Sequence, residues 1–423
     1  MKKEKVKIYE ARRNMTSLEV VDWSGLIDAD HLARRIVRVL DQLDLSTFYA
    51  KIVSRDSHQG RPAIDPKIML AIWIYAYMQG ISSSRVVADY CKWEPGFRWI
   101  LGHGLSIKHV SLSDFRKNLG TNLDDMLTQV VTLMVSAGVV DLDEVILDGT
   151  KIKASAGSNS FHTQQELEDL RDEVSKKIKA LDSEPHKQKQ QLALKKKKER
   201  VERGLQQIPE IQQACIEVAK KQKKGTKPKE AKASSTDPDA RKMYFSDGST
   251  NSGYNPQVMT TPKSGVIVDV KATQDRNDSN LMSPMLDSFK SRYGKYPKRF
   301  LADSHYPVQK DVVEALENEI DVYCPTRKGR KNSKEESKKR LERKRLKEPQ
   351  ALQDWRAKME TEEARTIRKR RSQTEKVHGW IKSKMPHSQL KLRGLVGVQT
   401  EMLLFSVAYN LKRYFNMTPL KAV

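Results

Sequence analysis

The chain has 423 residues, with 78 Lys and Arg against 54 Asp and Glu, which gives a formal net charge of +24. A charge of this size attracts phosphates and supports salt-sensitive binding, so we expect a nucleic acid as partner, and ribosomal or RNA-binding proteins share this composition. The length suits two or three domains. The three cysteines lie far apart without paired spacing, so neither a disulfide framework nor a zinc site is indicated.

No membrane segment is expected. The residues that follow Met1 lack the apolar core of a signal peptide. The longest apolar runs, near 69–78 and 402–411, are too short or too polar to cross a bilayer. The sequence therefore predicts a cytoplasmic protein without a membrane partner.

Residues 1–140 are predicted to form a helical N-terminal domain. Residues 66–78 are apolar on nearly every side, which indicates a buried helix. Further helices are expected from 82–84 through Trp93, and from Ser111 onward. Two interpretations stay open: a helix-turn-helix-like module that binds DNA ends, or a bundle that only supports the rest of the chain.

Two short strands each end in an aspartate. Residues 143–148 place three consecutive apolar residues before a turn glycine, which predicts a buried strand with Asp148 at its carboxyl end. Residues 298–303 have the same form, and the proline and apolar spacing after Asp303 predict a helix over 308–320. Ligands collect at the carboxyl ends of strands in open α/β sheets, so the repeated placement favours a shared site. Each aspartate alone would more often be a turn or N-cap residue.

The remaining elements complete a mixed α/β core over 141–157 and 236–326. They are an antiparallel hairpin, a helix and a last strand, at 254–261 with 265–273, at 281–293 and at 321–325. The chain order is then strand, hairpin, helix, strand, helix, strand, helix. This is the order of a ribonuclease H-like domain, a mixed sheet flanked by helices.

Two charged segments are predicted to be insertions. Over 158–235, apolar residues recur at spacings of three and four, which indicates a helical hairpin that extends from the catalytic sheet and adds no strands. The first apolar stripe lies at 167–181 and the second at 201–215, and the bend between the two helices is expected at 183–185. Its lysine-rich runs at 195–198 and 220–232 could contact DNA phosphates or form a solvated surface. The second insertion, 327–361, is also basic and precedes the last segment.

The last segment, residues 362–423, contains a helix with an acid between two bases. Glu375 follows Arg371 by four residues and precedes Lys382 by seven, so the three side chains share one helix face. A carboxylate beside cations, with two further carboxylates at strand ends, is what metal-dependent cutting of a phosphodiester would require. The simpler interpretation is a solvated helix with salt bridges.

These features together resemble the bacterial insertion-sequence transposases of the DDE type. The resemblance also covers four further segments, Gly60-Arg-Pro-Ala-Ile-Asp-Pro66, Gly80-Ile-Ser-Ser-Ser-Arg85, Asp237-Pro-Asp-Ala-Arg241 and Gly253-Tyr-Asn255. The three catalytic carboxylates of the family match Asp148, Asp303 and Glu375.

One branch of the family carries a tyrosine, an arginine, the glutamate and a lysine at fixed spacing. Arg371, Glu375 and Lys382 fit the last three positions, whereas Arg368 stands at the tyrosine position. Ser304-His305 also replaces the small residue and glycine that commonly follow the second aspartate.

The resemblance implies an enzyme that uses two Mg²⁺ ions, with Mn²⁺ as a substitute, held by Asp148, Asp303 and Glu375. DNA contacts are expected from Arg371, Lys382, Lys151 and Trp380, and the tryptophan could instead pack in the core. The implied partners are double-stranded DNA, as terminal inverted repeats and as target, and a second copy of the chain on that DNA. A bacterial cytoplasmic protein associated with the nucleoid would result.

In the implied reaction, water releases a 3′-hydroxyl that then attacks target DNA. Two other functions stay open from the sequence. One is a stand-alone nuclease that uses the same site, and the other is a DNA-binding relative that has kept the fold without catalysis.

Overall fold

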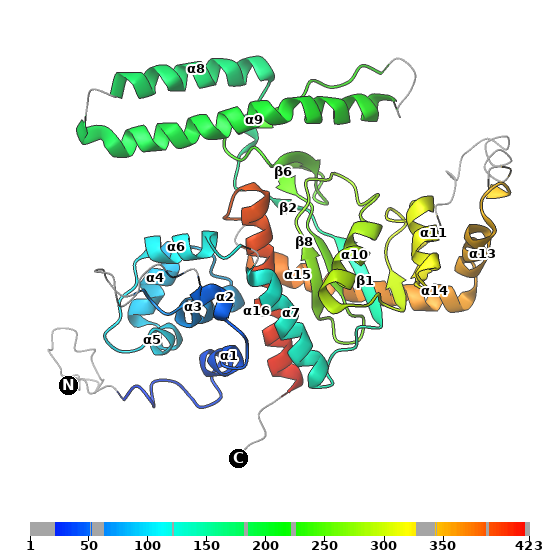
Figure 1. Ribbon diagram of the computed structural model, residues 1–423, viewed down its shortest axis with the longest axis horizontal. Coiled ribbons are helices and arrows are strands. Elements are labelled where there is room, and N and C mark those ends of the chain that lie inside the picture. The colour runs from blue at the N-terminus through cyan, green and yellow to red at the C-terminus, as the bar shows by residue number, and fades with distance from the viewer. Residues whose placement is uncertain are drawn as a thin grey trace, which may run out of the picture.

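The computed structural model describes residues 22–50, 52, 63–120, 122–181, 185–220, 226–326, 343, 345–385 and 389–418. None of the helices in these ranges is long and apolar enough to cross a membrane. Figure 1 shows a helical N-terminal region, a central sheet with helices around it, and a long helical hairpin that projects from the body.

The N-terminal region is helical, as the sequence predicted. Its helices are α1 (Leu32–Leu40), α2 (Ser46–Tyr49), α3 (Pro66–Gln79), α4 (Ser84–Trp93), α5 (Pro95–Leu101), α6 (His109–Lys117) and α7 (Asn122–Ser136). The α3 helix is buried on nearly every side; Asp65 caps its start and Gly80, with a φ of 79°, ends it. The helices expected at 66–78 and up to Trp93 are confirmed, and the one expected from Ser111 begins two residues earlier, at His109.

A five-stranded sheet forms the centre of the molecule. Its strands are β1 (Glu144–Gly149), β7 (Gln257–Thr260), β8 (Ile267–Lys271), β9 (Arg299–Leu301) and β10 (Asp321–Tyr323). They lie in the order β10-β9-β1-β7-β8. Strands β1, β9 and β10 are parallel neighbours, and β7 runs antiparallel to both β1 and β8. The sheet is therefore mixed, as predicted, and the 143–148, 298–303 and 321–325 strands are confirmed.

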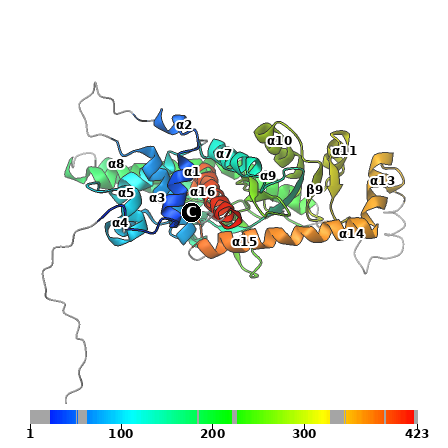
Figure 2. The ribbon, with the colours of Figure 1, turned by 90° about the horizontal axis from the view of Figure 1, so that it is seen from below.

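Helices cover both faces of this sheet. The connections from β8 to β9 and from β9 to β10 are α10 (Met282–Tyr293) and α11 (Gln309–Glu317), close to their predicted positions. On the other side lie α14 (Glu362–Lys369) and α15 (Gln373–Lys384), joined by the short 3₁₀ helix η3 (Arg370–Ser372), as Figure 2 shows. Before them α13 (Gln350–Met359) packs against α11.

The hairpin prediction was partly wrong. Residues 257–260 and 267–271 pair as expected, but Tyr254 ends β6 (Thr250–Tyr254) instead of opening the hairpin strand. With β2 (Ile152–Lys153) and β5 (Arg241–Tyr244), β6 forms a second, three-stranded sheet that the sequence did not predict. Pro256 separates β6 from β7, because proline has no N–H for a strand ladder.

The first insertion is a helical hairpin of α8 (Gln164–Leu181) and α9 (Gln188–Lys220). The two predicted apolar stripes meet, and Leu167, Val201 and Ile208 form a small core of their own. The prediction that this segment adds no strands was wrong at its base, where β3 (Phe161–His162) pairs with β4 (Ala233–Ser234), although neither strand joins the five-stranded sheet. The 3₁₀ turns η1 (Ser158–Ser160) and η2 (Pro185–Lys187) flank α8. The predicted bend at 183–185 lies mostly outside the described residues, as do 327–342 of the second insertion.

The last helix, α16 (Gly394–Met417), joins the N-terminal helices to the sheet. It is buried along most of its length and contacts α3, α7 and β8. One continuous hydrophobic core consequently extends from Ile27 to Phe415. Figure 1 shows α16 next to α7, between the N-terminal helices and the strands.

Candidate active site

Two aspartates lie at the same end of the central sheet. Asp148 is the penultimate residue of β1, and Asp303 follows the end of β9 by two residues. Because β1 and β9 are parallel neighbours, both carboxylates belong to the carboxyl end of the strands. Their side chains are 22% and 36% exposed, so solvent and a ligand can reach them.

The two carboxyl groups have different proton affinities. Burial raises the pKa of Asp148 to about 6; the Arg371 guanidinium opposes this change, and the carboxylates of Asp278 and Asp303 add to it. Burial would also raise the pKa of Asp303, but the Ser304 backbone N–H and Arg371 hold that pKa below its usual range. The site thus pairs one firmly ionised aspartate with one that titrates close to neutral pH.

One face of η3 and α15 points an arginine and a histidine at these aspartates. Arg371 Nη1 lies 3.6 Å from Asp303 Oδ2, and His378 Nδ1 lies 3.9 Å from Asp148 Oδ2. Lys382 is one turn further along; burial lowers the pKa of its amine, and the nearby Asp148 carboxylate opposes that change. The spacing expected for Arg371 and Lys382 therefore brings both beside the acidic pair.

Glu375 lies on the same face, one turn after Arg371 and one turn before His378, and its side chain is exposed. Among the residues that the structure describes, no three or more His, Cys, Asp or Glu side chains are arranged to hold a metal ion. The structure thus brings Asp148 and Asp303 together with Arg371, and it does not assemble all three predicted carboxylates into a finished cluster.

The donor set fits a hard divalent cation. Asp148 Oδ1 accepts the Gly149 backbone N–H at 3.0 Å, whereas its Oδ2 accepts no hydrogen bond from any described residue. An oxygen without a hydrogen-bond donor, close to a second carboxylate, is the kind of ligand that Mg²⁺ takes. The exposed Glu375 side chain adds a third carboxylate on the adjoining helix face.

Comparison with protein families identifies the chain. A family model described as "Transposase DDE domain" matches residues 144–411, which is more than half of the sequence. The chain belongs to the DDE transposases. A second model, described as "Transposase domain (DUF772)", matches residues 21–118 of this transposase. No curated protein and no solved structure matches it.

Two other side chains of the transposase that were predicted to contact DNA already have protein partners. Lys151 Nζ donates a hydrogen bond to the Tyr244 carbonyl at 2.9 Å. Trp380 is half-buried, with its ring centroid 5.0 Å from that of Tyr409, so core packing, the second interpretation of this tryptophan, describes its contacts. Arg368, at the position where one branch has tyrosine, donates to the Met359 carbonyl at 2.7 Å and so binds the end of α13.

Sequence reasoning missed several residues of this site. His378 could have been found, because it lies three residues after Glu375 and shares its helix face. Burial lowers the pKa of this imidazole to about 4, so it is neutral beside Asp148. Asp278 and Tyr306 lie in loops where no periodic pattern points to them.

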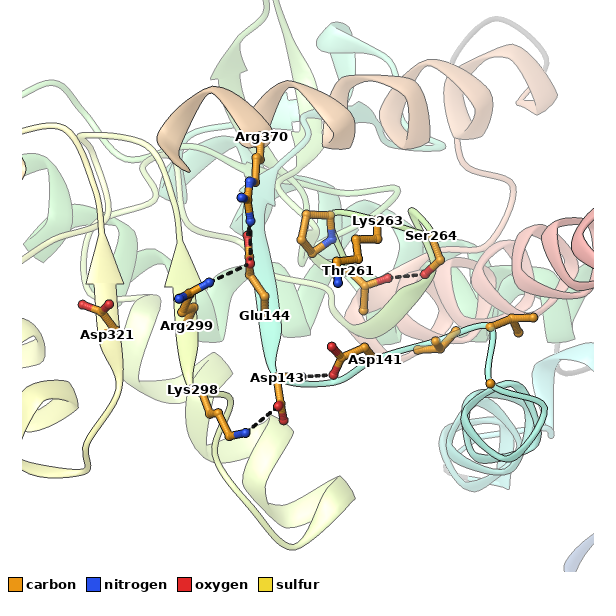
Figure 3. A pocket seen from close by; sticks show the side chains of 14 residues that line it. Asp141, Asp143, Glu144, Thr261, Lys263, Ser264, Lys298, Arg299, Asp321 and Arg370 are labelled. Carbon is orange, nitrogen blue, oxygen red and sulfur yellow. Dashed lines mark hydrogen bonds and ion pairs between the residues drawn. The ribbon is translucent and has the colours of Figure 1, made fainter. Parts of the chain in front are cut away.

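A cavity among the described residues of the transposase lies at the opposite end of the strands. It has a volume of about 810 Å³ and is lined by residues at the starts of β1, β9 and β10. Figure 3 shows that several of its charges pair with one another: Arg370 and Arg299 lie 3.0 and 3.7 Å from Glu144, and Lys298 lies 2.7 Å from Asp143. This cavity is therefore separate from Asp148 and Asp303.

Proposed function

We propose that this transposase binds the ends of an insertion sequence and catalyses metal-dependent DNA strand cleavage and strand transfer. The observation that supports it best is the pair Asp148 and Asp303 at the carboxyl ends of neighbouring parallel strands, with Arg371 against them. We further propose that the catalytic core is ribonuclease H-like. The mixed sheet, with β7 antiparallel and helices on both faces, supports this assignment.

Each carboxylate has a proposed role. Asp148, Asp303 and Glu375 would together hold two Mg²⁺ ions, or two Mn²⁺ ions, through their carboxylate oxygens. Bound there, the ions would stabilise negative charge on the attacking and leaving oxygens of the phosphodiester. The low pKa of Asp303 keeps it ionised for this purpose, and Asp148 must lose its proton before it can be a ligand.

The cations and the surrounding elements would hold the DNA. Arg371 and Lys382 flank the acidic pair and would contact phosphates next to the bond that is cut. Lys151 and Trp380 are further proposed contacts, and the charge of +24 supports long-range attraction of the duplex. Terminal inverted repeats and target DNA are the proposed ligands, bound by a homodimer that acts in the cytoplasm at the nucleoid.

Different regions of the chain would bind the DNA and carry the catalytic residues. We propose that residues 1–140 bind transposon ends and that 141–157 with 236–326 form the catalytic core. The glutamate helix would come from 362–423, and the insertions 158–235 and 327–361 would extend the basic surface.

A cleavage assay on DNA that carries the repeats flanking the gene tests the proposal. Asp148→Asn, Asp303→Asn and Glu375→Gln should each lower cleavage by more than about 100-fold, since each removes a group that stabilises the transition state. DNA binding should change little, because no phosphate contact is lost. Glu363→Gln, which changes an exposed acid on α14, is the matched control and should cleave normally.

The products separate the competing functions. A transposase joins the released 3′ end to target DNA, whereas a stand-alone nuclease with the same site gives only hydrolysis products. Normal cleavage by any one of the three variants would refute the assigned triad. Binding of the repeats without cleavage under Mg²⁺ or Mn²⁺ would favour the non-catalytic relative.

A further inference from the structure

Asp278 lies in the loop between β8 and α10, close to the end of β1 that carries Asp148. Its Oδ1 accepts hydrogen bonds from Asn255 Nδ2 at 2.8 Å and from Gln257 Nε2 at 3.1 Å. Both amide side chains are buried, and Gln257 pairs with Gly149 across β7 and β1. The Asp278 carboxylate is therefore held by the strand that neighbours Asp148.

Gly149 leaves the space that this carboxylate occupies. A Cβ on Gly149 would lie 2.5 Å from Asp278 Oδ1 and 2.7 Å from Gln257 Nε2, and both distances are shorter than real Cβ contacts. Any other residue directly after Asp148 would displace Asp278 or the strand. Close approach of this kind is a recognised reason for glycine inside a strand.

Further hydrogen bonds connect Gln257 to the loop that carries Asp303. The buried Tyr306 donates its hydroxyl to Gln257 Oε1, and its backbone N–H donates to the Asp303 carbonyl at 3.2 Å. Ser279 Oγ donates to the His305 carbonyl at 3.1 Å, which is a second link between the two loops. Asp278, β7 and the Asp303 loop thus form one hydrogen-bonded unit.

This unit connects the strand next to Asp148 with the loop that carries Asp303, and these are the two aspartates that we propose as metal ligands. Gln257 uses both of its polar ends, the amide toward Asp278 and the carbonyl toward Tyr306, so its orientation is fixed. A metal site tolerates errors in ligand distance of only about 0.2 Å. A buried network between the two ligand loops is therefore well placed to set that spacing.

We infer that Asp278 is a positioning residue for divalent ions, which acts through Gln257 and Tyr306 to fix the Asp303 loop relative to Asp148. The inference rests on the proposed function, because it takes Asp148 and Asp303 as the ligands. Asp278 itself need not touch the ions. Removing its charge or the Tyr306 hydroxyl should loosen the spacing and weaken metal binding without changing which groups bind.

The test uses the full chain with Asp278→Asn and, separately, Tyr306→Phe. Binding of Mn²⁺ without DNA is measured by electron paramagnetic resonance, and cleavage is measured as a function of Mg²⁺ concentration. Loss of groups that orient metal ligands typically lowers affinity by about 10–100-fold. Both variants should therefore need at least about tenfold more Mg²⁺ for half-maximal cleavage. High Mg²⁺ should restore the rate, which it would not do for a variant that is merely misfolded.

The chain offers a matched control pair. Tyr296 donates its hydroxyl to Asp287 Oδ1 at 3.0 Å, and Asp287 lies on α10, away from the strand ends that carry the aspartates. Asp287→Asn and Tyr296→Phe should keep the metal dependence of the native protein. If Asp278→Asn does not fold, Tyr306→Phe, which loses a single oxygen, decides the question.

Mn²⁺ affinity and Mg²⁺ dependence equal to those of the native protein in the folded variants would overturn the inference. A lower maximal rate at saturating Mg²⁺ with an unchanged half-maximal concentration would also overturn it. Because Mn²⁺ binding is measured without DNA, the two proposals can fail separately. A native protein that binds Mn²⁺ through Asp148 and Asp303 but cuts no DNA would refute the proposed function, and weaker Mn²⁺ binding by Asp278→Asn would still support the inference.

Discussion

Replacing Asp148 by Asn should stabilise the metal-free protein at neutral pH while it abolishes cleavage. The carboxylate of Asp148 is mostly buried beside the carboxylates of Asp278 and Asp303, so ionising it is unfavourable. Asparagine has nearly the same shape and carries no charge. Asp148→Asn should therefore raise the free energy of unfolding of the metal-free protein.

The size of the effect follows from the proton equilibrium. The pKa of Asp148 is about 6 in the folded protein, against an ordinary value of 3.8. Each pKa unit is worth about 1.4 kcal/mol, so this pKa difference corresponds to a change of at most about 3 kcal/mol in the free energy of unfolding. Since the folded pKa is the higher one, the stability due to the protonated acid is complete below pH 3.8 and is lost as pH rises through about 6.

Urea unfolding of both proteins between pH 4 and pH 8, with the metal chelated, measures the difference. Asp148→Asn should match the native protein near pH 4 and exceed it above about pH 7. Asp143→Asn is the control at the other end of β1: Lys298 and Lys295 lower the pKa of Asp143, so removing this charge should not stabilise the protein. Mg²⁺ should stabilise the native protein and not Asp148→Asn, because a ligand stabilises only the state that binds it.

Two results would refute this reasoning. One is an Asp148→Asn protein that is no more stable than the native protein at pH 7. The other is a difference in the free energy of unfolding that stays constant from pH 4 to pH 8. Either result would mean that the folded protein does not raise the pKa of the Asp148 carboxyl when no metal is bound.

Two further predictions concern DNA contacts and the core. Arg371→Ala and Lys382→Ala should each lower the slope of log affinity against log salt by about one, whereas a simple helix-surface pair would leave the slope unchanged. Arg292 is buried between Asp269, at 2.9 Å, and Asp124, at 2.7 Å. Arg292→Met should lower the free energy of unfolding by about 3–5 kcal/mol, because it leaves the buried Asp269 unpaired, and a urea midpoint equal to that of the native protein would contradict this.

The sequence by itself determined most of the local structure. The apolar spacing located α3, α8, α9, α10 and α11, and the short apolar runs located β1, β9 and β10, because these patterns depend only on neighbours in the chain. The placement of Asp148 and Asp303 at strand ends followed directly. So did the shared face of Arg371 and Lys382, because residues at these spacings meet on any helix.

Only the tertiary structure decided how these elements combine. The helices within residues 1–140 share one continuous hydrophobic core with the sheet, because α16 packs against α3, α7 and β8. Such contacts join positions hundreds of residues apart, so no local pattern encodes them. The same holds for the sheet of β2, β5 and β6, whose strands come from both sides of the helical insertion.

The chemistry of the site was also decided in three dimensions. Asp278 and Tyr306 come from two loops that meet at Gln257, and the pKa of Asp148 depends on burial by elements far away in the sequence. A sequence motif identifies only the types of residue that a reaction needs. Their distances and charges depend on packing, since desolvation and Coulomb energy are properties of the folded surroundings and not of the motif.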